Sequence, residues 1–192
     1  MDTHADQPGL EKLLFFYSFL RSPRTVGSVI PSSTFLSKKM VEDIDWKEAR
    51  VVVELGAGTG VFTSRIWRLS QEGTRIFVYE KDEWLRRRIA KKFPGIHVNE
   101  NACSLLSTLD QCGVAPGEVD VIISGLPFAN FPPQWRQEMV DKVYQALKQD
   151  GKFVTFQYSL QMKKLLSKTF TDLSMEFVPL NIPPAVVYKC TK

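Results

Sequence analysis

Three glycines at alternate positions, with an acidic residue before and after them, form the part of this sequence best suited to chemistry. The turn at residues 56–60, Gly-Ala-Gly-Thr-Gly, follows closely on Glu54. Glycines permit positive φ angles and let the backbone approach a ligand closely. A helix that starts after the turn offers free N–H groups to an anionic group such as a carboxylate. Glu80 follows about twenty residues later, where an acid can hydrogen-bond both hydroxyls of a ribose.

The glycine turn needs a strand before it and a helix after it, and the flanking apolar patterns predict both, at residues 51–55 and 61–69. Apolar runs predict six further strands at 75–79, 96–100, 119–123, 152–158, 174–180 and 185–190, and helical patterns occupy 82–93, 133–148 and 160–170. This alternation predicts an α/β fold of Rossmann-like type: a mostly parallel seven-stranded sheet, helices on both faces and a C-terminal antiparallel hairpin. Ligands bind such sheets outside the carboxyl ends of the strands.

Two cofactors suit this strand-turn-helix unit. A dinucleotide normally requires the spacing Gly-x-Gly-x-x-Gly, whereas this turn has Gly-x-Gly-x-Gly. S-adenosylmethionine has no phosphate and carries both of its amino-acid charges at one end. The segment 54–60, Glu-Leu-Gly-Ala-Gly-Thr-Gly, closely resembles the first motif of class I S-adenosylmethionine-dependent methyltransferases. The resemblance implies S-adenosylmethionine as cofactor and S-adenosylhomocysteine as product; a glycine-rich turn without a ligand is the alternative.

The loop after the fourth predicted strand, residues 124–128, is the second candidate for chemistry. Its sequence Ser-Gly-Leu-Pro-Phe stands where amino-methylating enzymes carry Asn/Asp-Pro-Pro-Tyr or Asn-Leu-Pro-Tyr/Phe. In those families the first side chain and a main-chain carbonyl hold the amine. Methyl transfer is an in-line displacement, so an enzyme mainly aligns a nitrogen lone pair and excludes water, without a metal or a covalent nucleophile. A β-turn that contains proline is the structural alternative.

Three segments, residues 26–33, 123–132 and 181–188, are similar to bacterial phospholipid N-methyltransferases, which methylate phosphatidylethanolamine towards phosphatidylcholine. With the glycine turn, the resemblance spans nearly the whole chain. It implies methylation of the phosphatidylethanolamine headgroup at an anionic membrane surface. The related rRNA adenine dimethylases, which have Asn at the position of Ser124, are the second hypothesis. A protein that binds S-adenosylmethionine at a lipid surface without turnover is the third.

The resemblance implies two sets of site residues. Cofactor contacts fall on Ile30, Pro31, Ser32, Glu54, Gly56, Ala57, Gly58, Thr59, Gly60, Glu80, Lys81, Asn101, Ala102 and Ser124. Methyl transfer falls on Ser124, Gly125, Leu126 and Pro127, with Tyr17 and Tyr158 as candidates for removing the amine proton. Water, or desolvation that lowers the pKa of the amine, are the other candidates for that step.

One position departs from the family pattern. After the third strand the family usually has Gly-Asp-Ala, and this chain has Glu100, Asn101 and Ala102. An aspartate there would accept a hydrogen bond from the adenine amino group. Asn101 can still accept through its carbonyl oxygen, without the charge. The difference bears on the affinity for the cofactor rather than on its identity.

Residues 10–21, from Leu10 to Arg21, read as a helix with a wide apolar face that contains three phenylalanines. This helix either packs on the domain or lies in a lipid surface. The stretch 12–40 contains basic residues and no acidic one, which together with the family resemblance favours an anionic membrane. A second helix is predicted at 34–44, capped by Ser32 or Ser33. We therefore expect a membrane-binding segment at residues 1–45 and a methyltransferase domain at 46–192.

Composition sets few further limits. The chain of 192 residues is 44% hydrophobic and 24% charged, which is typical of a globular protein, and its net charge of +4 permits an anionic partner without requiring one. Three cysteines and two histidines show no metal-ligand spacing, so we expect no metal site and reduced thiols.

With neither a signal peptide nor a long apolar run in view, we expect a cytoplasmic monomer, peripheral on the inner face of the cell membrane. We expect no nucleic-acid partner, because the chain ends directly after the last predicted strand, without an added helical domain.

Overall fold

The structure, a computed structural model, describes residues 30–181 and 183–192, and the side chains of α2 from Thr34 onward. Within these residues, seven strands form one sheet in the order β3-β2-β1-β4-β5-β7-β6. The strands are β1 (Val51–Leu55), β2 (Arg75–Tyr79), β3 (His97–Asn99), β4 (Val119–Ser124), β5 (Leu147–Gln157), β6 (Asp172–Val178) and β7 (Ala185–Thr191). Strands β1 to β5 are parallel, and β7 lies antiparallel between β5 and β6. The predicted sheet and its C-terminal hairpin are confirmed.

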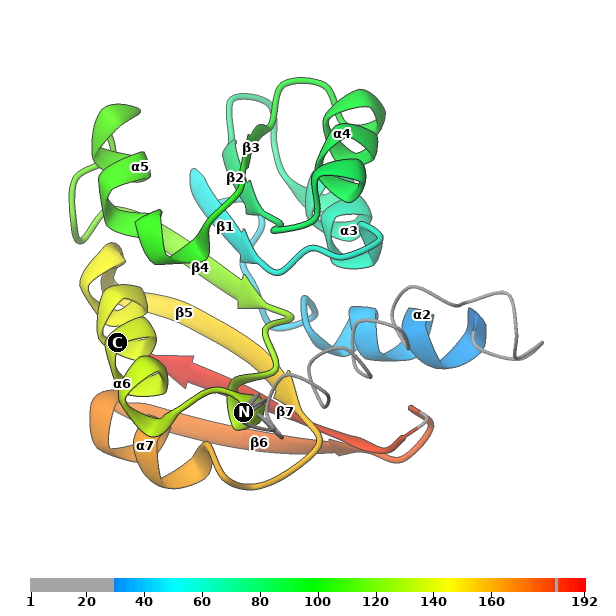
Figure 1. The fold of residues 1–192 in the computed structure, drawn as a ribbon, viewed down its shortest axis with the longest axis vertical. Coiled ribbons are helices and arrows are strands. Elements are labelled where there is room, and N and C mark those ends of the chain that lie inside the picture. The colour runs from blue at the N-terminus through cyan, green and yellow to red at the C-terminus, as the bar shows by residue number, and fades with distance from the viewer. Residues whose placement is uncertain (1–29, 182) are drawn as a thin grey trace, which may run out of the picture.

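Helices cover both faces of this sheet (Figure 1). They are α2 (Ile30–Lys39), α3 (Val61–Leu69), α4 (Glu83–Lys92), α5 (Leu105–Gln111), α6 (Pro133–Ala146) and α7 (Lys163–Thr169), with short 3-10 helices η1 (Ala102–Ser104) and η2 (Phe128–Asn130). Helices α2, α3 and α4 share one hydrophobic cluster with the sheet, and α5, α6 and α7 share the other. The sheet is therefore the middle layer of three.

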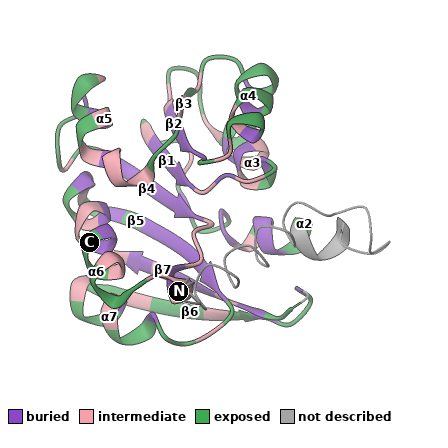
Figure 2. Ribbon diagram, in the orientation of Figure 1, coloured by how far each residue is buried: buried purple, intermediate pink, exposed green. Residues whose placement is uncertain are grey.

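The alternation of side chains along β1 supplies both clusters. Val52 packs in the cluster that contains Ile66 of α3, and Val53 packs in the cluster that contains Leu109 of α5 and Val143 of α6. All five are buried, and Figure 2 shows burial along the central strands. Burial on both faces explains why these strands are nearly continuous apolar runs in the sequence.

Several element boundaries differ from the predictions. Helix α2 begins at Ile30 rather than residue 34 and ends at Lys39 rather than residue 44, so Ser32 and Ser33 lie inside the helix instead of capping it. Pro31 fits this first turn because an N–H group there has no intrahelical partner. Helix α5 was not predicted, and β5 begins at Leu147, inside a stretch predicted as helix, because Leu147 pairs with Val119 of β4. The helix predicted at residues 10–21 lies outside the described residues.

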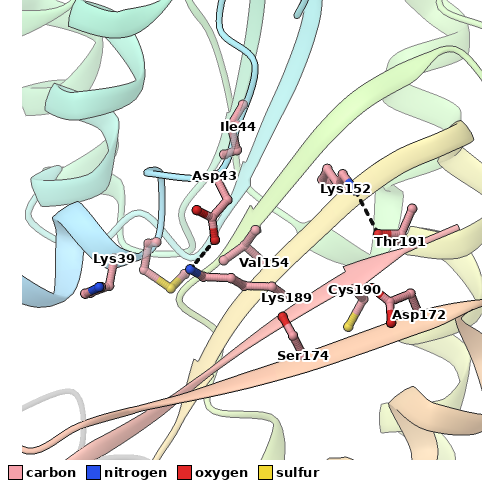
Figure 3. Close-up of a pocket in the computed structure, with 11 residues that line it drawn as sticks. Lys39, Asp43, Ile44, Lys152, Val154, Asp172, Ser174, Lys189, Cys190 and Thr191 are labelled. Atoms are coloured by element: carbon pink, nitrogen blue, oxygen red, sulfur yellow. Dashed lines mark hydrogen bonds and ion pairs between the residues drawn. The ribbon is translucent and has the colours of Figure 1, made fainter.

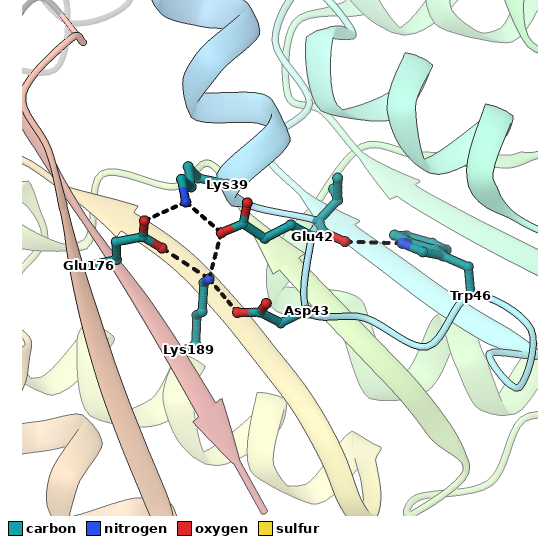
Figure 4. A network of polar contacts seen from close by, with 7 residues as sticks. Lys39, Glu42, Asp43, Trp46, Glu176 and Lys189 are labelled. Atoms are coloured by element: carbon teal, nitrogen blue, oxygen red, sulfur yellow. Dashed lines mark hydrogen bonds and ion pairs between the residues drawn. The ribbon is translucent and has the colours of Figure 1, made fainter.

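A network of ion pairs joins the segment after α2 to the C-terminal hairpin (Figure 4). Lys39 lies 2.6 Å from Glu176 of β6 and 2.9 Å from Glu42. Lys189 of β7 contacts Glu42 at 3.2 Å, Glu176 at 3.1 Å and also Asp43. Burial alone would lower the pKa of Lys189, but hydrogen bonds to the three acids outweigh it and raise that pKa. The network holds two segments together that lie far apart in the sequence.

A hollow of about 190 Å³ lies beside this network, towards the amino ends of β5 and β6 (Figure 3). Its wall contains three lysines and two aspartates, and several of these have partners: Lys152 donates to the Thr191 hydroxyl at 2.8 Å, and Lys189 contacts Asp43. The thiol of Cys190 in this wall is buried, which raises its pKa to about 12. The hollow lies at the opposite edge of the sheet from the glycine turn.

Candidate functional site

Main-chain hydrogen bonds bring the loops after four strands together at the carboxyl edge of the sheet. The N–H groups of Gly56 and Ala57 donate to the Tyr79 carbonyl oxygen at 2.8 and 3.1 Å. Gly125 donates to the Leu55 carbonyl oxygen at 2.8 Å, and Glu80 donates to that of Asn99 at 3.0 Å. The glycine turn, the acid after β2 and the loop after β4 therefore share one edge, as the parallel strands predicted, and the loop after β3 joins them.

The glycine turn has the backbone that its composition suggests. Gly56, Gly58 and Gly60 have φ angles of +76°, +55° and +83°, a region that residues with a side chain rarely adopt. A Cβ atom built on Gly58 would meet no atom within 4 Å, so this residue faces open space. Gly60 is the N-cap of α3 and gives the helix no side-chain cap. The first turn of α3 thus keeps N–H groups for an anionic ligand.

Glu54 lies beneath this turn and is fully buried. Its Oε2 atom accepts a hydrogen bond from the Thr63 hydroxyl at 2.6 Å, whereas Oε1 has no partner among the described residues. Burial raises the pKa of Glu54 to about 7, against the opposing effect of Thr63. A buried carboxylate oxygen without a donor is costly. It is therefore a candidate acceptor for a cationic group of a ligand.

Glu80 is buried at the end of β2, where its carboxylate is already bonded to the protein. It accepts from the Gly58 N–H at 2.7 Å and from the Asp82 N–H at 2.9 Å, so it ties the glycine turn to the start of α4. Each carboxylate oxygen keeps a further lone pair, which suits a hydroxyl donor. Arg86 of α4 fixes the same loop by donating to the carbonyl oxygens of Glu80 at 3.0 Å and Lys81 at 2.6 Å. The sequence had not singled out Arg86 for this role.

A cavity of about 260 Å³ opens between the ends of β2, β3 and β4. Gly56, Tyr79, Lys81, Glu100, Asn101, Ala102 and Cys103 form one part of its wall, and Leu126, Pro127, Phe131 and Trp135 form the other. The rings of Phe131 and Trp135 lie 4.0 Å apart between their centroids. The cavity therefore combines apolar and aromatic walls with a few polar groups, which is the usual character of a small-molecule site.

The loop after β4 packs tightly against the glycine turn. A Cβ atom built on Gly125 would lie 2.7 Å from the Gly56 carbonyl oxygen, so the two backbones touch only because Gly125 has no side chain. The buried Ser124 accepts from the Leu126 N–H through its hydroxyl oxygen at 3.2 Å. The backbone contact between Gly125 and Gly56 places the predicted methyl-transfer loop directly beside the predicted cofactor turn.

Gln157, at the end of β5, holds this loop and was missed by the sequence analysis. Its Nε2 donates to the Leu126 carbonyl oxygen at 2.9 Å, and its Oε1 accepts from the Ala129 N–H at 3.3 Å. Leu126 O also accepts from the Phe128 N–H at 2.9 Å, so both of its lone pairs are used. Gln157 is buried and lies 31 residues from Leu126, so no local pattern could reveal the contact.

The remaining predicted residues lie in different settings. Tyr158 directly follows β5, and its side chain is 38% exposed. Burial raises the pKa of its phenol, although a hydrogen bond with Asn181 opposes this shift, so the phenol is neutral at neutral pH. Ile30, Pro31 and Ser32 form the first turn of α2, and Thr59 is exposed in the glycine turn. Tyr17 lies outside the described residues. In the part of the chain that the structure describes, no cluster of three or more His, Cys, Asp or Glu could hold a metal ion.

Comparison with known proteins identifies the family. Residues 29–176 match the family described as methyltransferase small domain. The chain belongs to this methyltransferase family. It is 34% identical over 185 residues to an ornithine lipid N-methyltransferase of Singulisphaera acidiphila, a match that covers 92% of this chain and 94% of that protein. A ribosomal RNA small subunit methyltransferase A of Thermotoga neapolitana is also 34% identical, but over 83 residues, which cover 41% of this chain and 30% of that protein.

Solved methyltransferases share the fold of this family member. A 1,6-didemethyltoxoflavin-N1-methyltransferase of Burkholderia thailandensis, solved with S-adenosylhomocysteine, has a TM-score of 0.68 at 16% identity over 100% of this chain and 93% of that chain. PigF with S-adenosylhomocysteine has a TM-score of 0.62 at 16% identity over 95% of this chain and 59% of that chain. The chain is a Rossmann-like methyltransferase and its cofactor is S-adenosylmethionine, as predicted.

Proposed function

We propose that this methyltransferase transfers a methyl group from S-adenosylmethionine to a primary amine in a lipid headgroup. The observation that carries the proposal is the 34% identity, over nearly the full length of both chains, to an ornithine lipid N-methyltransferase. An ornithine lipid is therefore the first substrate to test. Phosphatidylethanolamine is the second, because the sequence segments 26–33, 123–132 and 181–188 resemble enzymes that methylate it. Ornithine and ethanolamine both end in a primary amine.

The cofactor would be held by the carboxyl edge of the sheet. The ammonium group of its amino-acid end suits the unpartnered oxygen of Glu54, and its carboxylate suits the N–H groups at the start of α3. The ribose hydroxyls suit Glu80, and Gly58 leaves open space beside that carboxylate. The adenine then enters the cavity that Lys81, Asn101 and Ala102 help to line. The cofactor supplies an activated methyl group on its sulfonium centre.

The amine would be aligned by the loop after β4. The Leu126 carbonyl oxygen already accepts two hydrogen bonds, from Gln157 and from the Phe128 N–H, so it has no lone pair left for the amine. We assign the contact with the amine to Ser124, whose carbonyl oxygen accepts from the Thr155 hydroxyl at 3.2 Å. Gln157 holds the loop in place, and Phe131 with Trp135 forms an apolar wall that excludes water. Alignment and dehydration are the main requirements of an in-line displacement.

The ammonium form of the substrate must lose a proton before it can attack. Tyr158 is a neutral phenol at neutral pH, because burial raises its pKa, so it is a poor base. His97, the histidine within the described residues, stacks on Phe77 at 4.6 Å, at the amino end of β3. Transfer of the amine into the apolar mouth of the site would lower the amine pKa, since desolvation disfavours the charged form. We therefore propose desolvation, with release of the proton to water, as the route.

The membrane part of the proposal rests on the sequence. The apolar helix predicted at residues 10–21 and the basic residues after it suit an anionic bilayer. No helix within the described residues is long and apolar enough to cross a membrane. We propose peripheral binding on the inner face of the cell membrane, with residues 1–45 as the membrane-binding segment and 46–192 as the catalytic domain. Residues 36–49 contribute several side chains to the core of that domain.

A labelling experiment tests the proposal. The purified chain is incubated with methyl-labelled S-adenosylmethionine and anionic vesicles that contain an ornithine lipid, phosphatidylethanolamine or neither, and in parallel with ribosomal RNA. We expect label in the lipid fraction only when an amine-bearing lipid is present. Label in the RNA would support the rRNA-methylating hypothesis instead. Binding of the cofactor without label in either fraction would support a non-catalytic protein.

A further inference from the structure

The side chain of Asn101 has a fixed orientation at the mouth of the cavity. Its Oδ1 atom accepts a hydrogen bond from the Cys103 N–H at 2.9 Å and so caps η1. The main chain of Asn101 is fixed as well, because its carbonyl oxygen accepts from the Ser104 hydroxyl at 2.7 Å. Only the oxygen of an amide can accept from an N–H group, so the contact with Cys103 determines which way the amide is turned. The Nδ2 atom is left on the other side.

The cavity that Asn101 lines is the one next to Glu80. The Glu80 N–H donates to the Asn99 carbonyl oxygen at 3.0 Å, so the ends of β2 and β3 lie side by side. An acid at the end of β2 is the ribose-binding group of such folds. The base is attached to that ribose, and the neighbouring space bounded by Lys81, Ala102 and Leu126 is the space open to it. A base placed there would present its hydrogen-bonding edge to Asn101.

We propose that Asn101 recognises adenine as a hydrogen-bond donor, with Nδ2 bonded to ring nitrogen N1. The Watson–Crick edge of adenine presents an acceptor at N1 and a donor at the 6-amino group. An aspartate in this position could use one oxygen for the Cys103 N–H and the other to accept from the 6-amino group. Asparagine replaces that second oxygen with an N–H donor, which suits N1 and not the amino group. Because the side-chain carbonyl oxygen of Asn101 is engaged by the Cys103 N–H, this donor role replaces the acceptor role expected from the sequence. The polarity of base recognition is thus reversed relative to a chain with aspartate here.

Binding of S-adenosylhomocysteine analogues to wild type and Asn101→Asp tests this inference by calorimetry. Aspartate keeps the oxygen that caps η1, so the variant should unfold at the same temperature or higher. In wild type, the 1-deaza analogue should bind about 3- to 10-fold more weakly than S-adenosylhomocysteine, the cost of one hydrogen bond, and the analogue that lacks the 6-amino group should lose less than about twofold. In Asn101→Asp the order should reverse. Equal affinity of wild type for S-adenosylhomocysteine and its 1-deaza analogue would overturn the proposal even if the variant did not fold.

The proposal for Asn101 assumes that the adenine lies in the cavity. A substitution that fills the cavity tests this assumption separately. Ala102→Phe should occupy the cavity and weaken S-adenosylhomocysteine binding by more than about tenfold. Unchanged affinity in a folded Ala102→Phe protein would mean that the base lies elsewhere, and the role of Asn101 would fall with it. Neither measurement depends on the lipid substrate, so failure of the proposed lipid methylation would leave both results interpretable.

Discussion

Gly125 and Gly56 lie in direct backbone contact, although they come from loops after different strands. A Cβ atom on Gly125 would be 2.7 Å from the Gly56 carbonyl oxygen, closer than such atoms approach in folded proteins. The Gly125 N–H also donates to the Leu55 carbonyl oxygen at 2.8 Å. The loop that is proposed to hold the amine and the turn that is proposed to hold the cofactor therefore form one packed unit.

Substitution of Gly125 should weaken cofactor binding indirectly, by displacing the glycine turn that it contacts. Gly125→Ala should push the glycine turn away from β4 and weaken S-adenosylhomocysteine binding by about tenfold or more, measured by calorimetry. Gly113→Ala is the matched control: Gly113 has a φ angle of +70° and open space around it, so alanine there should cost about 1 kcal/mol of stability without changing affinity. Equal loss of affinity in both variants would point to general destabilisation instead.

Glu54 should make cofactor binding depend on pH. Its pKa is about 7 in the folded protein, because of burial, and an ammonium group beside Oε1 would lower it. Affinity for S-adenosylhomocysteine should therefore rise roughly tenfold from pH 6 to pH 8, with uptake of a proton by the buffer. Glu54→Gln should remove most of this dependence. A wild-type affinity that is constant over this range would contradict the proposed contact.

The same group predicts the opposite trend in the stability of the ligand-free protein. The folded-state pKa of Glu54 lies above its usual value of 4.5, so the folded state binds more protons than the unfolded state between about pH 4.5 and 7. The contribution of Glu54 to the free energy of unfolding should therefore fall as pH rises through this window. Chemical denaturation of wild type and Glu54→Gln at several pH values isolates the contribution of Glu54. The free energy of unfolding of wild type should fall relative to that of Glu54→Gln as pH rises.

Gln157 should matter for turnover more than for cofactor affinity. Gln157→Leu removes the donor to Leu126 O and the acceptor for the Ala129 N–H, which frees the loop that aligns the amine. We expect kcat on the lipid substrate to fall about tenfold or more while S-adenosylhomocysteine affinity changes by less than about twofold. Gln145→Leu, on the exposed side of α6, is the control and should behave as wild type. Loss of affinity with unchanged turnover would place the loop at the cofactor instead.

Lys189 should stabilise the junction between α2 and the hairpin. Lys189→Met removes the cation that Glu42, Asp43 and Glu176 share, and leaves Lys39 as the remaining partner of Glu42 and Glu176. The free energy of unfolding should drop by about 1 kcal/mol in low salt and by less in high salt, because screening weakens both the lost attraction and the new repulsion. Lys164→Met, an exposed lysine of α7, should have little effect. An equal change in the two variants would show that the network adds no stability.

The predicted helix at residues 10–21 should bind anionic vesicles. Burial of its apolar face is worth about 25 cal/mol per Å² and each nearby basic residue adds up to about 1 kcal/mol. Phe16→Glu should abolish flotation with anionic vesicles, Arg21→Glu should weaken it, and both should retain S-adenosylhomocysteine binding. Salt should weaken flotation of the wild type. Failure of the wild type to float would make this helix part of ordinary core packing.

The sequence by itself determined the strands of the sheet, most of its helices and the edge at which the candidate site lies. The glycine turn after Val51–Leu55, the acid after Arg75–Tyr79 and the proline loop after β4 are local patterns, and parallel strands place the loops after them at one edge. These features can be predicted from the sequence because the end of a strand and the glycines of a turn are set by residues close by in the chain.

Only the tertiary structure decided how these groups are paired. The saturation of Leu126 O by Gln157, the amide orientation of Asn101 in the cavity wall and the unpartnered oxygen of Glu54 are contacts set by packing. The start of α2 at Ile30 was missed as well, and Arg65 of α3 supports that helix by donating to Ser37 Oγ at 2.6 Å. Some of these contacts join residues far apart in the sequence, and others depend on which lone pairs are already used. A local sequence pattern predicts neither kind.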